Sequence, residues 1–212
     1  EAVVLPHIFG EGRGRIDAAV LSHDANDHAG GFPSVADQVP IERKFSGEPY
    51  KTGGLDCARL RPSIWTWDGV SFSFFDGRPP QVRDANDVSC VIRIQGKYGS
   101  ALLTGDIEAA AEQTLVDRYG SALKVDVLQV PHHGSNTSST AGFLNAASPR
   151  HALLSRGRKN RFGHPAPEVE NRYFRKRVRI WDTAKHGQID LQSGANGWQI
   201  RTFLDAHARF WH

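Results

Sequence analysis

Apolar and polar residues alternate in two neighbouring pairs of segments near the middle of the chain. Residues 63–67 and 70–75 flank Asp68-Gly69, a dipeptide typical of two-residue hairpin turns. Residues 89–94 and 100–103 form a second pair, and the turn between them begins and ends with glycine. The pattern therefore predicts antiparallel strands in this region.

In the rest of the chain, predicted strands alternate with predicted helices. Short apolar runs that are typical of strands occupy residues 16–21, 41–45, 125–130, 151–155, 178–181, 188–192 and 198–203. Segments with helical composition or helix start signals occupy residues 32–39, 107–119, 138–147 and 165–175. A helix end is expected within residues 1–9, and residues 46–54 and 77–87 are predicted as loops. The mixture predicts an α/β sandwich with mixed sheets, not a purely parallel, doubly wound sheet.

The composition is compatible with a single domain over residues 1–212, because 39% of the residues are hydrophobic and can form one substantial core. The sequence has no run of about 20 apolar residues that could span a bilayer, and no charged-then-apolar leader. Since it begins at Glu1 and contains no Met, we expect a piece of a longer protein. The net charge of +3 permits an anionic partner without requiring one.

Ligand-type side chains cluster where the first predicted strand ends. His23, Asp27 and His28 follow residues 16–21 closely and lie within six residues of one another. Imidazole and carboxylate groups are typical ligands of divalent cations that activate water. A tight loop can direct all three into one small volume, so we predict a metal site. The alternative is a polar loop with two ordinary histidines.

Two later strand ends offer further ligands. Asp106 follows Gly105, where glycine permits a sharp turn, although Asp106 could instead cap the next helix. His132 and His133 follow the predicted strand 125–130. Because side chains alternate along a strand, one ring should point toward the site and its neighbour away or alongside. We favour His133 as the ligand and His132 as the contact to substrate or water, but spacing alone leaves the order open.

Three polar residues near these strand ends are candidates for binding a phosphate. Ser135 precedes the predicted helix 138–147, whose first backbone N–H groups favour an anion. Asn160 and His164 precede a helix predicted to start at Pro165, near its positive end. Structural alternatives exist for each: helix caps for Ser135 and Asn160, and an ordinary surface position for His164.

Basic residues gather in two runs, residues 156–161 and 172–179, and such runs attract phosphate backbones without regard to sequence. The second run contains or adjoins three aromatic residues, Tyr173, Phe174 and Trp181. Proteins that bind single strands use such residues to stack on bases. The alternative is a solvated helix face with packed aromatic side chains.

The loop with His23, Asp27 and His28 resembles the His-x-His-x-Asp-His signature of the metallo-β-lactamase fold. It is most similar to the variant in the ComEC family of DNA-uptake channels, where the second His is commonly Asp. Further segments that resemble this family, in the same order, are residues 67–70, 89–91, 103–108, 131–135 and 160–165.

The resemblance implies an αββα sandwich in which two sheets face each other and the metal site lies at one edge. It also implies a role in natural transformation, with this domain acting as a nuclease on the non-transported strand of single-stranded DNA. The domain would belong to a bacterial inner-membrane protein, beside its channel and N-terminal domains, and would lie outside the cytoplasm. That location would favour a disulfide between Cys57 and Cys90 over two buried thiols.

Departures from the family pattern affect the expected site. Ala25 stands where the family has a ligand, and no His occurs near Asn86, where many metallo-β-lactamase folds have another. The expected ligands are His23, Asp27, His28, Asp106 and His133. They predict one firm site and a second that is weak or absent, with manganese or zinc as the metal and manganese favoured at the weak position. The family's leading strands are also missing before Glu1.

These features lead to three functional hypotheses. The first is metal-dependent hydrolysis of DNA, in which Asp27 ligates the metal and orients the water, and His132 or His164 contacts the phosphate or protonates the leaving oxygen. The second, favoured by Ala25, is a catalytically impaired module that guides DNA or braces the channel. The third is another phosphodiester or ester hydrolase of the same fold.

Overall fold

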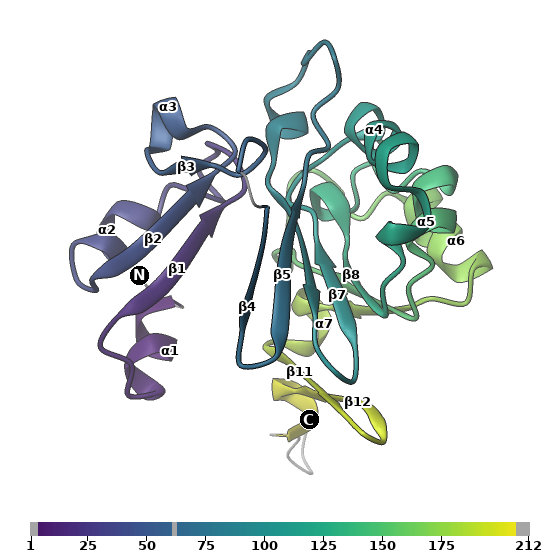
Figure 1. Ribbon diagram of the computed structural model, residues 1–212. Coiled ribbons are helices and arrows are strands. Elements are labelled where there is room, and N and C mark those ends of the chain that lie inside the picture. Colours follow the sequence, from purple (N-terminus) through teal and green to yellow (C-terminus); the bar gives the residue numbers. More distant parts are fainter. Residues whose placement is uncertain (1–3, 61–62, 207–212) are drawn as a thin grey trace.

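A small and a large β-sheet face each other in the computed structural model, which describes residues 4–60 and 63–206 (Figure 1). Helices cover the outer side of each sheet, so the layers run helix, sheet, sheet, helix. The predicted α/β sandwich is therefore confirmed. Of its two facing sheets, the large one is mixed and the small one is parallel.

The small sheet has three strands in the order of the sequence. They are β1 (Ile16–Leu21), β2 (Ile41–Ser46) and β3 (Leu55–Asp56). The helices of this half are α1 (Val4–Gly10), α2 (Phe32–Ala36) and α3 (Pro49–Thr52). Leu5, Val35 and Val39 pack together in an apolar cluster beside the small sheet. Because β1 and β2 are parallel, the loops that follow them lie at the same edge of the sheet.

The large sheet has the strand order β10-β9-β8-β7-β6-β5-β4. Its strands are β4 (Ile64–Trp67), β5 (Val70–Phe75), β6 (Val91–Gln95), β7 (Ser100–Leu103), β8 (Val127–Gln129), β9 (His151–Leu154) and β10 (Arg179–Asp182). Both predicted hairpins are confirmed, since β4 pairs with β5 and β6 with β7 in antiparallel register. From β7 to β10 the pairing is parallel.

The main apolar core lies between the large sheet and its three helices (Figure 1). The helices are α4 (Ala109–Tyr119), α5 (Ala141–Ala147) and α6 (Pro167–Arg175). On α6, Val169 and Tyr173 are one helical turn apart and both are buried, as the amphipathic pattern requires. Shorter helices are η1 (Ala85–Val88), η2 (Gly120–Leu123), η3 (Pro131–Gly134), α7 (Thr183–His186) and α8 (Phe203–Ala206). None of the helices described here has the length and hydropathy needed to cross a bilayer.

A second apolar cluster fills part of the seam between the two sheets. Phe45 from β2 packs against Phe74 from β5, with ring centroids 5.2 Å apart. Cys57 and Cys90 are joined by a disulfide within this cluster, which confirms the expected bridge. The bond links the chain just after β3 to the chain just before β6, so it ties the small sheet to the large one.

Some predicted elements differ from the structure, and the last two predicted strands are present in a sheet of their own. Residues 46–54, predicted as a loop, contain α3, which begins at Pro49. The helix predicted over residues 138–147 begins only at Ala141, because the buried carboxylate of Glu112 accepts the N–H groups of Ser139 and Thr140. The last two strands, β11 (Ile189–Gly194) and β12 (Gly197–Thr202), pair with each other in a separate sheet.

Candidate metal centre

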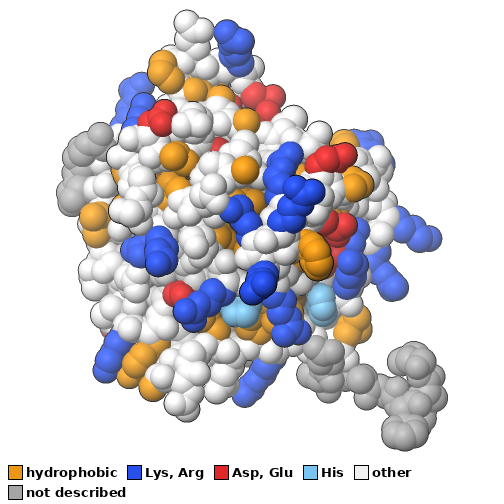
Figure 2. All heavy atoms as spheres, turned by 90° about the vertical axis from the view of Figure 1, so that its right-hand side faces the viewer, with side chains coloured by type: hydrophobic (Ala, Val, Ile, Leu, Met, Phe, Trp, Pro, Cys, Tyr) orange, Lys and Arg blue, Asp and Glu red, His pale blue; other side chains and the backbone are white. Residues whose placement is uncertain are grey.

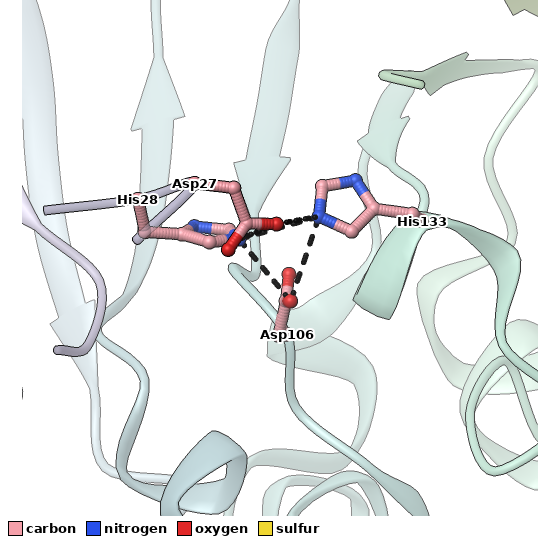
Figure 3. Close-up of side chains that lie close together, drawn as sticks. All are labelled: Asp27, His28, Asp106 and His133. Carbon is pink, nitrogen blue, oxygen red and sulfur yellow. Dashed lines mark hydrogen bonds and ion pairs between the residues drawn. The ribbon is translucent and has the colours of Figure 1, made fainter. Parts of the chain in front are cut away.

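Four side chains from three loops converge at one edge of the sandwich (Figure 3). Asp27 and His28 follow β1, Asp106 follows β7, and His133 follows β8 within η3. The metal-type ligand atoms of these four residues all lie within 4.8 Å of one another. The small sheet therefore supplies two ligands and the large sheet the other two.

The shortest distance in this group joins Asp106 and His28. The Oδ2 atom of Asp106 lies 3.1 Å from Nε2 of His28 and 3.5 Å from Nε2 of His133. The two Nε2 atoms are 3.3 Å apart, and Oδ2 of Asp27 lies 3.4 Å from Nε2 of His133. Two imidazole nitrogens and two carboxylates thus face one small volume, and this donor set suits zinc or manganese.

Hydrogen bonds hold both ligand rings in the orientation that a metal needs. Nδ1 of His133 donates to the carbonyl oxygen of Ser155 over 2.7 Å, so the lone pair of Nε2 faces the cluster. Nδ1 of His28 lies 3.0 Å from Oγ of Ser22, so Nε2 of His28 also faces the cluster. Metal-binding histidines usually bond through the second ring nitrogen in this way, because that bond fixes the tautomer.

Asp106 also carries an unsatisfied polar atom. Its Oδ1 is buried and finds no hydrogen-bond partner among the described residues, an arrangement that costs free energy unless a partner such as a cation is supplied. Burial would raise the pKa of Asp106, but the hydrogen bond from His28 and the neighbouring histidine charges lower it. Burial would lower the pKa of His28, but the hydrogen bond to Asp106 and the charges of Asp106 and Asp27 together outweigh burial and raise that pKa. The residues present therefore fit a divalent cation.

The turn that carries the paired histidines is left-handed. His132 and His133 have φ values of 47° and 51°, which are rare for non-glycine residues and are often found at functional sites. Gly134 follows at φ 82°, and a Cβ there would lie 2.6 Å from Cβ of Pro165. The strand ends before the two histidines, and both rings line the same cavity, with His132 alongside the ligand His133.

His132 is paired with a carboxylate that the sequence reasoning missed. Oε1 of Glu108 lies 3.0 Å from Nδ1 of His132 and accepts a hydrogen bond from Oγ1 of Thr137 over 2.9 Å. Glu108 is the N-cap residue of α4, two residues after Asp106. A Gly-Asp-x-Glu pattern at a strand end was the available signal, but an acidic residue at a helix start usually serves the helix itself.

Three of the four ligands, Asp27, Asp106 and His133, line a cavity of about 430 Å³. Its wall includes the predicted site residues His23, Asp27, Asp106, His132, His133, Asn160 and His164, together with Ala25 and Asn86. His23 is buried and lies outside the four-residue cluster, with Nδ1 3.2 Å from Oγ of Ser22. Burial, followed by the charge of His28, lowers the pKa of His23.

Two predicted substrate contacts have structural roles in their own loops. Asn160 lies in the cavity wall, but its amide is bonded at both ends to the backbone of His164, at 2.8 Å each. Ser135 is not part of the wall that the described residues form, and its hydroxyl lies 2.9 Å from that of Thr137. Asn160 therefore lies in the cavity wall and stabilises the 160–164 segment, whereas Ser135 lies outside that wall.

The basic runs are only partly available to a ligand. Arg156 is paired with the buried Asp182 at 2.6 Å, and Arg172 donates to the carbonyl oxygen of Ser138. Tyr173 and Trp181 are buried, so for these two the alternative of packed aromatics holds. On the face shown in Figure 2, Lys and Arg side chains are dispersed among neutral and acidic ones and do not form one stripe.

Comparison with known proteins gives this site a family. The family model described as the metallo-beta-lactamase superfamily matches residues 2–158. The chain belongs to the metallo-β-lactamase superfamily. A solved metallo-β-lactamase fold protein from Bacillus subtilis, YhfI, aligns with 84% of this chain and 79% of its own, with a TM-score of 0.48 and 15% identity.

The expected similarity of this metallo-β-lactamase domain to competence proteins is also confirmed. The chain is 37% identical over 195 residues to competence protein ComA of Neisseria gonorrhoeae, covering 92% of this chain and 28% of that protein. It is 37% identical to recombination protein 2 of Haemophilus influenzae and 28% identical to ComE operon protein 3 of B. subtilis. These matches cover 89% and 91% of this chain, and 24% and 26% of the relatives. The chain therefore spans about a quarter of the length of the curated relatives it matches.

Proposed function

We propose that this chain is a metal-dependent phosphodiesterase domain that hydrolyses single-stranded DNA during natural transformation, where it degrades the strand that is not transported. The observation that carries the proposal is the convergence of Asp27, His28, Asp106 and His133, with Oδ1 of Asp106 buried and without a hydrogen-bond partner among the described residues. The similarity to proteins named for competence and recombination supports DNA as the substrate.

The side chains around the cavity have distinct tasks in this proposal. A divalent cation, manganese or zinc, held by the four ligands would supply an acidified water and stabilise charge on the phosphate oxygens. The exposed carboxylate of Asp27 orients the water. His132 donates its Nδ1–H to Glu108, and a second proton, carried on Nε2 when the ring is doubly protonated, passes to the leaving oxygen. His164 and Asn160 line the same cavity, where His164 contacts the phosphate.

We propose one firm metal position and a weak second one. His23 and Ala25 line the same cavity as Asp27, Asp106 and His133, but the methyl group of Ala25 cannot bind a metal. The side-chain nitrogen of Asn86 lies 3.4 Å from Oε1 of Glu108, so its amide faces that carboxylate. Ala25 also favours the second candidate function, a catalytically impaired module that guides DNA or braces the channel.

The location follows from the same similarity. We propose that the domain belongs to a bacterial inner-membrane protein and lies outside the cytoplasm, in contact with the channel and N-terminal parts of that protein. The Cys57–Cys90 disulfide supports this location, since such bonds persist in oxidising compartments.

The test combines metal content with a substrate panel. The purified chain is dialysed, analysed for bound metal, and incubated with manganese and single-stranded DNA, double-stranded DNA, a small phosphodiester and small carboxylic esters. Cleavage of single-stranded DNA that depends on metal supports the nuclease. Metal binding without any hydrolysis would favour the impaired module, and hydrolysis of esters alone would identify a different hydrolase of this fold.

A further inference from the structure

A phenylalanine ring lines the cavity that the candidate metal ligands Asp27, Asp106 and His133 also line. Phe162 lines that cavity, yet 67% of its surface is exposed. It lies in the loop between β9 and α6, inside the short segment that Asn160 closes through its two hydrogen bonds to His164. Single exposed apolar residues are ordinary on protein surfaces, so the significance of this ring depends on its neighbours.

Aromatic rings connect Phe162 to the metal ligands in steps. The ring centroids of His132 and His164 are 5.9 Å apart, and those of His164 and Phe162 are 5.8 Å apart with an interplanar angle of 17°. His132 is adjacent in sequence to the ligand His133. The rings therefore lead from the ligands, past the two histidines proposed to contact the phosphate, to the rim of the cavity.

A cation completes the outer end of this path. The guanidinium carbon of Arg161 lies 4.9 Å from the centroid of the Phe162 ring. An exposed aromatic ring beside a guanidinium group is the combination on which nucleobases stack in proteins that bind single strands, because every base offers a π-face and the cation attracts the backbone. A carboxylic ester or a simple phosphate has no group that would use such a surface.

We propose that Phe162, supported by Arg161, is the stacking platform for an unpaired nucleobase next to the scissile phosphate, and that it selects single strands at this site. The inference rests on the proposed function, which places a phosphodiester at the metal ligands. In a duplex the face of each base is covered by its neighbours, so only single strands and frayed ends can stack on the ring. The contact tolerates any sequence, since it uses the face of the base and not its edge.

Binding measurements test this platform separately from catalysis. Fluorescently labelled oligo(dT), and an oligonucleotide of the same length made of abasic sites, are titrated with protein in EDTA, so that no strand is cleaved. The variants are Phe162→Ala, Phe162→Trp and the matched control Phe174→Ala. Phe174 is 79% exposed, lies on α6 and is not part of the described cavity wall.

We expect Phe162→Ala to weaken oligo(dT) binding by about 5- to 150-fold, the contribution of one stacked base, and to leave abasic binding unchanged. Phe162→Trp should retain or tighten oligo(dT) binding, and Phe174→Ala should behave as the unaltered chain. Equal losses with both oligonucleotides, equal losses in the two alanine variants, or no oligo(dT) binding by the unaltered chain would each overturn the platform. Base-dependent binding without cleavage in manganese would leave the platform standing and remove the nuclease. Cleavage in manganese, with oligo(dT) binding unaffected by Phe162→Ala, would support the nuclease and overturn the platform.

Discussion

Oε1 of Glu108 lies 3.0 Å from Nδ1 of His132, and the same carboxylate accepts a hydrogen bond from Thr137. His132 lines the cavity next to the candidate ligand His133, and Glu108 supports it from the start of α4. This contact fixes the orientation of the His132 ring, and the doubly protonated ring can then donate its Nε2 proton to a leaving oxygen.

His132→Ala is expected to lower the rate of DNA cleavage by about 10²- to 10⁴-fold, since a positioned general acid contributes that much. Glu108→Gln, which retains the shape of the side chain but not its charge, is expected to have a smaller effect in the same direction. Steady-state cleavage assays with metal content measured in parallel check this, and Glu170→Gln, an exposed residue of α6, serves as the control. Loss of bound metal in either variant would mean that the pair acts on the metal site instead.

Asp106→Asn is expected to remove most of the bound metal, because Asp106 contacts both ligand histidines and has the only buried oxygen in the described cluster without a partner. We expect the metal affinity to fall by at least about 100-fold, more than the loss of a supporting residue causes. Elemental analysis after dialysis and calorimetric titration with manganese measure it. Asp24→Asn is the matched control, as Asp24 is exposed and its carboxylate lies 3.9 Å from Nζ of Lys51. An equal loss in both variants would remove Asp106 from the site.

Reduction of the disulfide is expected to destabilise the chain. Cys57 and Cys90 are 33 residues apart, and closing a loop of that size contributes about 3–4 kcal/mol through the entropy of the unfolded chain. Guanidinium denaturation with and without a reductant measures the difference. The double variant Cys57→Ala/Cys90→Ala should show no response to the reductant. If the reductant destabilised the double variant as much as the unaltered chain, the effect would not come from this disulfide.

His151 is expected to make stability depend on pH. Burial, together with the charges of Arg179 and Arg150, lowers its pKa, and its Nδ1 accepts a hydrogen bond from Nε1 of Trp181. As the pH falls through about 6.5, the unfolded chain gains a proton that the folded chain resists, so the free energy of unfolding decreases. His151→Gln should lose less stability than the unaltered chain on going from neutral to acidic pH.

The measurement for His151 is urea denaturation in EDTA at several pH values. His7→Gln, at an exposed position of α1, is the control and should follow the unaltered chain. Identical pH profiles for His151→Gln and the unaltered chain would show that His151 does not contribute.

The sequence was most informative where a feature is local. The strand β1 and the hairpin turn at Asp68-Gly69 follow from short-range apolar patterning and turn chemistry. The gathering of Asp27, Asp106 and His133 could be anticipated because each follows a predicted strand, and strand ends meet at one edge of a sheet.

What could not be anticipated depends on contacts between distant segments. The pairing of Glu108 with His132 requires the start of α4 to lie against η3, and nothing in the sequence around Glu108 specifies that contact. The late start of α5 follows from the carboxylate of Glu112, which takes N–H groups from another segment. The exposure of Phe162 is likewise decided by the loop that Asn160 closes, whereas Tyr173 is held inside by the core.

Asp27 and His28 belong to one half of the sandwich, and Asp106 and His133 to the other. A cation bound by all four residues would cross-link the two halves, and the Cys57–Cys90 disulfide is a second, covalent cross-link between them. A force that separates the two halves would disrupt the metal site before it broke the disulfide. Metal-dependent chemistry at this edge would therefore require the two halves to stay docked, so a force applied to the domain would change its activity.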